Sequence, residues 1–190
     1  MKSEIRIIGI DDAPFTFNDD KTDIIGVVMR GNNYIEGVLH DIIQIDGLDA
    51  TKKCEKMITK TRHYTQLKAV LFDGSTQGGF NIIDTELLWK KTKIPNITVT
   101  RKHPDFKKIQ RALQTHFSDW KQRLSLLEKG RLYKMKTAYN PIFIKCEGIS
   151  FSQSKEIIKL ATIRGVIPEP LRIAHIIASG ISKGESYGKA

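Results

Sequence analysis

The chain has 190 residues, of which 40% are hydrophobic and 27% are charged. The length suffices for one sizeable core, so we expect a single globular domain over residues 1–190. No apolar run approaches the about 18 residues that a membrane helix needs, and no signal-peptide pattern opens the chain, so a cytoplasmic location is expected. The 31 Lys and Arg against 21 Asp and Glu give a formal net charge of +10, which favours a polyanionic partner.

The two cysteines indicate neither a disulfide-stabilised nor a zinc-stabilised domain. Cys54 and Cys146 lie far apart in the chain, and neither belongs to a CxxC pair. Neither a disulfide framework nor a cysteine-based zinc site is therefore predicted, and we expect both side chains to be buried apolar residues of the core.

Three strand-like runs open the chain and are typical of a β-meander. They cover residues 4–10, 24–29 and 34–45, and the turn signal RGNN stands before the third run. Helical spacing follows, with Asp49 or Thr51 as the capping residue. The elements predicted after this helix are a buried strand at 68–73, a helix at 84–91, a strand at 96–100, a long basic helix at 105–127, a strand at 142–146, a helix from Ser152 or Ser154 to 164, a helix from Pro170 and a loose tail at 182–190.

This order of elements predicts an α/β fold built on one mixed sheet. The antiparallel meander joins parallel βαβ units, whose crossovers place helices on both faces of the sheet. Ligands of such sheets bind at the carboxyl ends of the strands. We therefore expect functional side chains where the predicted strands end.

Three aspartates stand at such strand ends. Asp11 follows RIIGI, Asp46 follows IIQI and Asp73 follows AVLF. Clustered carboxylates repel one another unless a cation offsets their charge, and their hard oxygens suit Mg²⁺ or Mn²⁺, which also accept phosphate oxygens. The set predicts a metal site, with Asp12 and Asp49 as nearby acids of unassigned role. Each aspartate taken alone also fits an ordinary turn after a strand.

Other polar residues near these strand ends are candidates for binding a phosphate or a base. Residues 73–80, DGSTQGGF, carry Ser75 and Thr76 after a strand, but the segment has neither Walker nor GxGxxG spacing and also fits a plain turn. Arg172 and His175 share a helical face near a helix N-terminus, which favours anions, although a lone histidine also fits a structural role. The basic stretches fit either a backbone-binding patch or a solvated helix face, and they contain Arg101, Lys102, Lys107, Lys108, Lys121 and Arg123.

Five runs together resemble a known family. IIGIDDAPF, IDGLDAT, LFDGSTQGGFNIID, IPNITVTRKHPD and IPEPLRIAH are similar, in order and spacing, to the archaeal DUF99 family, also called UPF0215, which is related to endonuclease V. The resemblance covers nearly the whole chain. It implies a ribonuclease H-like fold and, as in endonuclease V, Mg²⁺ held by acidic residues for cleavage of nucleic acid near deaminated purines, inosine in particular.

The resemblance also implies roles for individual residues. Asp11 takes the place of the nuclease's first-strand aspartate, and Asp73 takes that of the aspartate in its DGHG segment. His175, in PEPLRIAH, matches the active-site histidine in the nuclease's PEPTRxAH segment. Asp46 is the nearest acid to the place of the nuclease's glutamate, and Asp41 is a weaker candidate for that place.

Two departures from endonuclease V concern the substrate. Ser75 stands where the DGHG segment has its histidine. The strand-separating PYIPG wedge of the nuclease is represented only by NYIEG at residues 33–37, which lacks its proline. These departures affect the parts of the nuclease that serve strand opening and inosine recognition.

The sequence is compatible with two main functions. The first is an endonuclease V-like phosphodiester hydrolase acting on DNA or RNA, in which the three aspartates bind Mg²⁺ or Mn²⁺ and activate water. Arg172 or His175 would then help to hold the scissile phosphate. The second is a non-catalytic nucleic-acid-binding module on the same fold, in which the basic helix from Asp105 binds. A weaker third hypothesis is an interaction protein whose charge is incidental.

Overall fold

A seven-stranded mixed sheet forms the centre of the molecule, with the strand order β3-β2-β1-β4-β7-β9-β8. The structure is a computed structural model and describes residues 4–16 and 18–186. The strands β1, β2 and β3 form the predicted antiparallel meander, β4 and β7 run parallel to β1, and β9 and β8 add antiparallel pairs at the far edge. The strand bounds are β1 (Arg6–Asp12), β2 (Lys21–Arg30), β3 (Tyr34–Gln44), β4 (Leu67–Asp73), β7 (Asn96–Thr100), β8 (Tyr133–Met135) and β9 (Ile142–Glu147).

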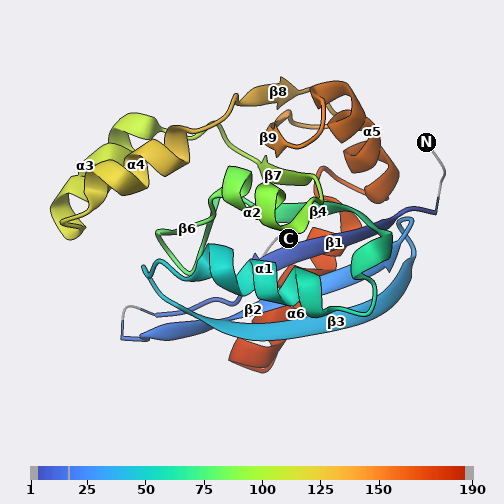
Figure 1. Cartoon of the computed structure of the whole chain (residues 1–190), viewed down its shortest axis with the longest axis horizontal. Coiled ribbons are helices and arrows are strands. Elements are labelled where there is room, and N and C mark those ends of the chain that lie inside the picture. The colour runs from blue at the N-terminus through green and yellow to red at the C-terminus, as the bar shows by residue number, and fades with distance from the viewer. Residues whose placement is uncertain (1–3, 17, 187–190) are drawn as a thin grey trace.

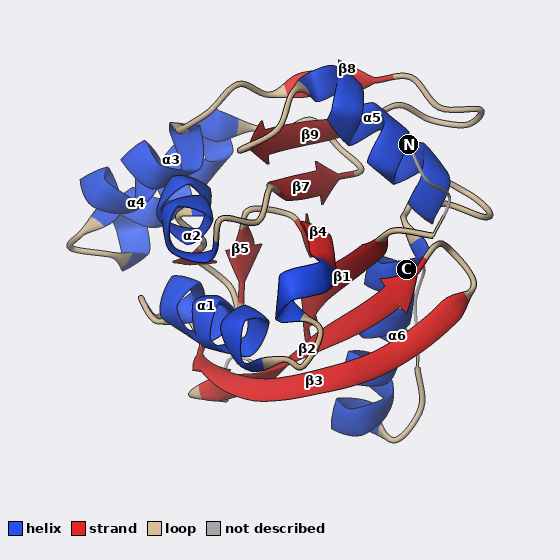
Figure 2. Ribbon diagram, turned by 45° about the vertical axis from the view of Figure 1, so that its right-hand side comes forward, coloured by secondary structure: helices blue, strands red, loops and turns tan. Residues whose placement is uncertain are grey.

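Helices cover both faces of this sheet, as the sequence predicts, with α1 on one side and α6 on the other (Figure 1). A separate pair, α3 and α4, lies side by side near β7 and β9 (Figure 2). None of the helices in the described ranges combines the length and the apolar character needed to span a bilayer. The helix bounds are α1 (Ala50–Lys60), α2 (Thr85–Thr92), α3 (Phe106–His116), α4 (Trp120–Glu128), α5 (Phe151–Ala161) and α6 (Glu169–Lys183), with a 3₁₀ turn η1 (Tyr64–Gln66).

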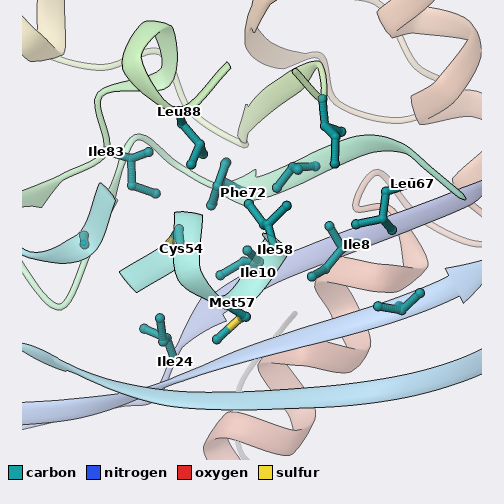
Figure 3. Packing of buried hydrophobic residues seen from close by; sticks show 14 of the residues in the cluster. Ile8, Ile10, Ile24, Cys54, Met57, Ile58, Leu67, Phe72, Ile83 and Leu88 are labelled. Carbon is teal, nitrogen blue, oxygen red and sulfur yellow. The ribbon is translucent and has the colours of Figure 1, made fainter. Parts of the chain in front are cut away.

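Strand alternation divides the core into two layers. Ile8 and Ile10 of β1 point to the α1 side, where they pack with Phe72 of β4 and with Cys54 of α1 (Figure 3). The intervening Ile7 points to the opposite side, into a cluster with α5 and the start of α6. The prediction of a buried cysteine is therefore confirmed for Cys54, whereas Cys146 is only partly buried and both thiols are free.

Three predicted helix boundaries differ from the structure. The expected single helix over residues 105–127 is two helices, because the chain leaves helical geometry at Phe117, whose ring packs edge-on against Phe80 at 5.7 Å between centroids. The cap of α5 is Ser150 instead of Ser152 or Ser154, since Ser150 and Gln153 form a reciprocal capping box. The expected tail at 182–190 begins inside α6, which continues to Lys183, and residues 187–190 lie outside the described residues.

Several short elements went unpredicted because two or three residues carry too little periodicity to be recognised. They are β8 at the sheet edge and a small hairpin made of β5 (Thr76–Gln77) and β6 (Asn81–Ile82). The hairpin follows β4 directly, so the loop after Asp73 folds back instead of extending into solvent. Asp49 begins α1 as predicted but makes no side-chain cap bond, because its Oδ1 accepts from the Asn81 amide at 2.7 Å.

Close contact between β1 and α6 depends on Gly9. A Cβ atom at this position would lie 2.4 Å from the carbonyl carbon of Pro170 and 2.6 Å from the amide nitrogen of Leu171. These are backbone atoms and cannot turn aside as a side chain would. Glycine therefore lets the first turn of α6 rest directly on the centre of β1, two residues before Asp11.

We predict that Gly9→Ala lowers the free energy of unfolding by about 1–3 kcal/mol, the usual cost of overpacking a core. The matched control is Gly180→Ala in the same helix, where an added Cβ meets nothing within 4 Å. This control is expected to leave stability unchanged or raise it by up to about 1 kcal/mol, because alanine is the better helix former. Urea denaturation measures both, and equal midpoints for the two variants would contradict the tight contact.

Candidate active site

Two of the predicted aspartates meet at the carboxyl ends of adjacent parallel strands. Ile10 of β1 is in register with Phe72 of β4, so Asp11 and Asp73, the next residue on each strand, share one edge of the sheet. Alternation turns both side chains to the face that α6 covers. Asp11 is almost fully buried, with 5% of its surface exposed, whereas Asp73 is partly open to solvent.

Helix α6 brings His175 to the same place. Its Nδ1 lies 2.9 Å from Oδ2 of Asp11, across 164 positions of sequence. The hydrogen bond with Asp11 raises the pKa of His175 above its ordinary value, against the opposing effect of burial. The imidazole is thereby held beside the carboxylates.

Burial, followed by the like charge of Asp11, shifts the pKa values of the neighbouring acids. Burial, and next the charge of Asp11, raise the pKa of Asp73 to about 6, although Arg101 and His175 oppose the shift. Burial and Asp11 also raise the pKa of Asp12 to about 7, against the hydrogen bond that the Gly78 amide donates to its Oδ2 at 3.0 Å. A cation bound beside Asp12 and Asp73 would favour their ionised forms and lower both pKa values.

The donor chemistry of this group fits a hard divalent cation. Mg²⁺ binds through one or two carboxylates, keeps several waters and takes phosphate oxygens as further ligands, and Asp11 and Asp73 offer such a pair. Within residues 4–16 and 18–186, no group of three or more His, Cys, Asp or Glu side chains is placed to hold a metal ion by itself. The arrangement is thus open, unlike a closed structural zinc site.

Asp46 is not gathered into a group of three with Asp11 and Asp73. Its backbone is left-handed, with φ 56°, and its Oδ1 accepts a hydrogen bond from the Phe80 amide at 2.7 Å. Gly79 has φ 76°, and an added Cβ would lie only 2.3 Å from that Oδ1, so a larger residue there would be strained and would displace the Asp46 carboxylate. Asp46 thus fastens the hairpin that follows β4.

Asp41, the weaker candidate for the same role, is engaged elsewhere. It pairs with Lys53 at 2.9 Å and with Lys56 at 3.8 Å, both on α1. Burial acts to raise the pKa of Asp41, but these ion pairs and the amide of Ile42 outweigh it and hold the pKa below its ordinary value. Its carboxylate therefore fixes α1 against β3.

The basic residues predicted to contact nucleic acid separate into two groups. Arg101 lies 3.7 Å from Asp73, and Arg172 is held by Glu169 through two hydrogen bonds of 2.9 and 2.7 Å. With Lys102 they line an open groove of about 810 Å³. Arg123 is instead 5% exposed and binds the carbonyl oxygens of Gly47 and Phe80 at 3.1 and 2.7 Å, so it is no part of a surface patch.

Sequence reasoning missed some members of this groove. Arg164 and Tyr139 line it alongside Phe143, and the described lining residues include no carboxylate. Tyr139 lies in the segment TAYNP, whose exposed aromatic ring in a polar connection was the available signal. Arg164 lies just after the end of α5. Neither Arg164 nor its neighbour Gly165 belongs to a sequence motif that would have indicated the groove.

Ser75 and Thr76 lie at the other side of the same sheet edge. They line a cavity of about 300 Å³ together with Lys102 and residues of β7 and β9. The segment at residues 33–37 is far from both features, because Tyr34 pairs with Arg30, which pairs with Arg6 at the start of β1. The segment that the sequence suggested as a counterpart of the endonuclease V wedge thus stands at the end of the sheet opposite to Asp11.

The arrangement has known counterparts. A crystal structure of a protein of unknown function from Archaeoglobus fulgidus matches with a TM-score of 0.84 and 34% identity over 94% of this chain and 98% of that one. Endonuclease V from Ciona intestinalis, in complex with a 24mer DNA containing an inosine followed by a ribo-adenosine, matches with a TM-score of 0.59 and 14% identity over 90% of this chain and 83% of that one. The fold is therefore the ribonuclease H-like fold of endonuclease V, as the sequence predicts.

The chain belongs to the Endonuclease dU family, whose model matches residues 3–182. A UPF0215 protein from Methanothermobacter thermautotrophicus is 46% identical over 192 residues, which cover all of this chain and 94% of the relative. The resemblance to UPF0215 is thereby confirmed. Family and fold together are those of a nuclease-type protein that acts on nucleic acid.

We predict a specific pH dependence from Asp12. Since its folded-state pKa of about 7 exceeds the ordinary 3.8, the stability that Asp12 contributes when protonated is lost as pH rises from about 4 through about 7. Asp12→Asn stays neutral and can still accept from Gly78. In EDTA, the Tm of Asp12→Asn minus the Tm of the natural protein should therefore increase by at least about 3 °C from pH 5 to pH 8. This corresponds to about 1 kcal/mol.

The control for this measurement is Asp20→Asn, which removes one exposed carboxylate and thus the same net charge. Its Tm is expected to follow that of the natural protein at every pH. If the Tm of Asp12→Asn also followed that of the natural protein at every pH, the pKa of Asp12 would not be raised by burial and by the charge of Asp11.

Proposed function

We propose that this protein is a divalent-metal-dependent endonuclease that hydrolyses a phosphodiester bond in nucleic acid carrying a deaminated base. The observation that carries the proposal is the placement of Asp11, Asp73 and His175 at one edge of a ribonuclease H-like sheet. Burial and the charge of Asp11 raise the pKa of Asp73 to about 6, so an anionic Asp73 is disfavoured by its surroundings. A bound cation would remove that repulsion.

Asp11 and Asp73 would hold Mg²⁺ or Mn²⁺ in this proposal. Such a cation, when bound, lowers the pKa of a coordinated water and offsets charge on phosphate oxygens. His175 presents Nδ1 to Asp11, which leaves Nε2 as the ring nitrogen that can hold a proton for the leaving oxygen. Asp46 acts as a positioning residue, because it fixes the hairpin that leads away from Asp73.

Arg101 would balance the charge of the scissile phosphate. Its guanidinium stands 3.7 Å from Asp73, close to the cation site, and its side chain is exposed to solvent. Guanidinium groups match phosphate oxygens in a two-pronged geometry. The groove that begins at Arg101 continues past Lys102, Arg164 and Arg172, so a backbone that enters at Asp73 stays in contact with cations.

The groove also suits a single strand better than a closed duplex. Tyr139, with 65% of its surface exposed, and the ring of Phe143 offer faces on which bases can stack. The family name refers to dU, and the Ciona endonuclease V was crystallised with inosine-containing DNA. Both are products of base deamination, which supports a substrate with a deaminated base.

The first test is cleavage of labelled single- and double-stranded DNA and RNA, with uracil, inosine or neither at one position, in Mg²⁺ or Mn²⁺. The natural protein should cleave, and Asp11→Asn and Asp73→Asn should each lose more than about 100-fold, since second-sphere changes alone cost 10–100-fold at metal sites. Asp20→Asn serves as the charge control and should keep full activity.

A second readout does not depend on cleavage. Mn²⁺ should raise the Tm of the natural protein, because a ligand that binds only the folded state stabilises it, and this shift should vanish in Asp73→Asn. Absence of both cleavage and a Mn²⁺-dependent shift, with nucleic-acid binding retained by the aspartate variants, would reject the enzyme and establish a binding module.

The basic groove predicts how the affinity for nucleic acid depends on salt concentration. Replacing Lys102 and Arg164 together by glutamine should reduce the slope of log affinity against log salt concentration for a single-stranded oligonucleotide by about 0.7 for each phosphate that the protein no longer neutralises. Lys52→Gln on α1, far from the groove, should leave the slope unchanged. Fluorescence anisotropy in EDTA measures this, and an unaltered slope in the double variant would place the strand elsewhere.

A further inference from the structure

The two edges of the seven-stranded sheet are built differently. At one edge, β8 has 3 residues, with exposed Lys134 at its centre and exposed Arg131 and Lys136 close by. A short strand with basic side chains is protected against pairing with another chain. At the other edge, β3 has 11 residues and forms the outer rim of the sheet (Figure 2), and none of its residues is Lys, Arg or Pro. The β3 edge therefore lacks the protection that the β8 edge has.

The backbone of β3 directs every second residue away from the sheet. The amide of Ile45 donates to the carbonyl oxygen of Asp20 at 2.9 Å, so the odd-numbered residues of β3, as far as the bulge near its start, bond to β2. The N–H and C=O groups of Val38, His40 and Ile42 therefore point outward. Within residues 4–16 and 18–186, no further strand lies beyond β3 to receive them.

The side chains of the same three residues form an apolar strip beside α6. Val38 pairs with Val27 of β2, whose side chain packs under α6, so alternation turns the strip to the α6 face. Val38 is 49% exposed and Ile42 is 44% exposed. Between them, His40 lies 2.6 Å from the carboxylate of Asp23. The strip is thus apolar at both ends, and its central polar group already has a partner.

This edge is complementary to itself. In antiparallel pairing with a second copy about a two-fold axis at His40, Val38 of each chain lies opposite Ile42 of the other, and the two His40 residues lie opposite each other. Each of these pairs can exchange two backbone hydrogen bonds. The amide of Ile42, which donates to Asp41 at 2.8 Å within one chain, would exchange this bond for one across the interface, and Asp41 would keep Lys53.

Charge favours this register over its neighbours. Pairing about Leu39 would place Ile42 opposite Glu36 of the second copy, and pairing about Asp41 would place two aspartates opposite each other. Like charges directly opposite each other destabilise a pair of strands, and a carboxylate against an apolar side chain loses solvation. The axis at His40 avoids both contacts and matches apolar residues with apolar residues.

We propose that this protein forms a two-fold homodimer through β3, in which the two sheets join into one continuous sheet centred on His40. One such contact uses the β3 edge of both chains and leaves only the two basic β8 edges, so the assembly closes as a dimer. The axis is perpendicular to the sheet. Both α6 faces, each with its own Asp11 and Asp73, therefore lie on the same side of the dimer.

Sedimentation of the full chain over a range of concentrations tests the dimer. The natural protein should sediment at twice the 21.6 kDa of one chain, with a Kd of about 1 μM or tighter. Ile42→Lys should raise this Kd at least about 100-fold, because each copy brings an ammonium group against Val38 of the other. The matched control is Ile163→Lys, an exposed isoleucine near β8, which adds the same charge and should leave the Kd unchanged.

Cysteine crosslinking tests the register. His40→Cys should form a disulfide between chains on mild oxidation, since paired Cα atoms about 5.5 Å apart are within disulfide range. Val38→Cys is the matched control, because its equivalent in the second copy lies about 13 Å away along the strands. Adding Ile42→Cys to Val38→Cys should restore crosslinking. The natural protein, whose Cys54 is buried and whose Cys146 is partly buried, should stay uncrosslinked.

The inference does not depend on the proposed function. A natural protein that stays monomeric up to about 100 μM, or a dimer that Ile42→Lys leaves intact, would overturn it. Crosslinking of Val38→Cys alone, without crosslinking of His40→Cys, would overturn the axis at His40. A dimer that cleaves no nucleic acid and shows no Mn²⁺-dependent shift in Tm would reject the proposed function alone, whereas cleavage by a monomeric protein would reject this inference alone.

Discussion

The contact between β1 and α6 is the constraint on which the candidate site depends. Gly9 allows the backbone of Pro170 to rest on the strand, and this fixes the start of α6 relative to the sheet edge. From that start, His175 reaches Asp11 at 2.9 Å. Without the close approach, the histidine and the aspartate would belong to two unrelated elements, because 164 positions of chain separate them.

The acids at this edge work against the stability of the fold. Asp12 and Asp73 both have raised pKa values, mainly because they are buried and because Asp11 adds a like charge nearby. A purely structural aspartate has its pKa lowered by its partners, as Asp41 does beside Lys53. Groups that cost stability in the absence of a ligand are typical of functional sites, where a cation or a substrate offsets the cost.

Because side chains alternate along a strand, the two faces at this sheet edge carry different functional groups. Asp11 and Asp73 point to the α6 side, next to the basic groove, whereas Thr98 and Lys145 point to the side that α3 and α4 cover. The loop after Asp73 is the junction between the two faces.

The sequence by itself determined the meander, the parallel strands and the positions of Asp11 and Asp73, because strand periodicity and strand-terminal acids are local signals. It also placed Arg101 and His175 among the candidates, through motif and charge. Only the tertiary structure decided that Asp46 fastens a hairpin, that Arg123 is buried, and that Lys145 lies at the floor of a cavity. These facts depend on which distant backbone carbonyls and amides each polar side chain meets, and chain-local patterns do not encode those long-range contacts.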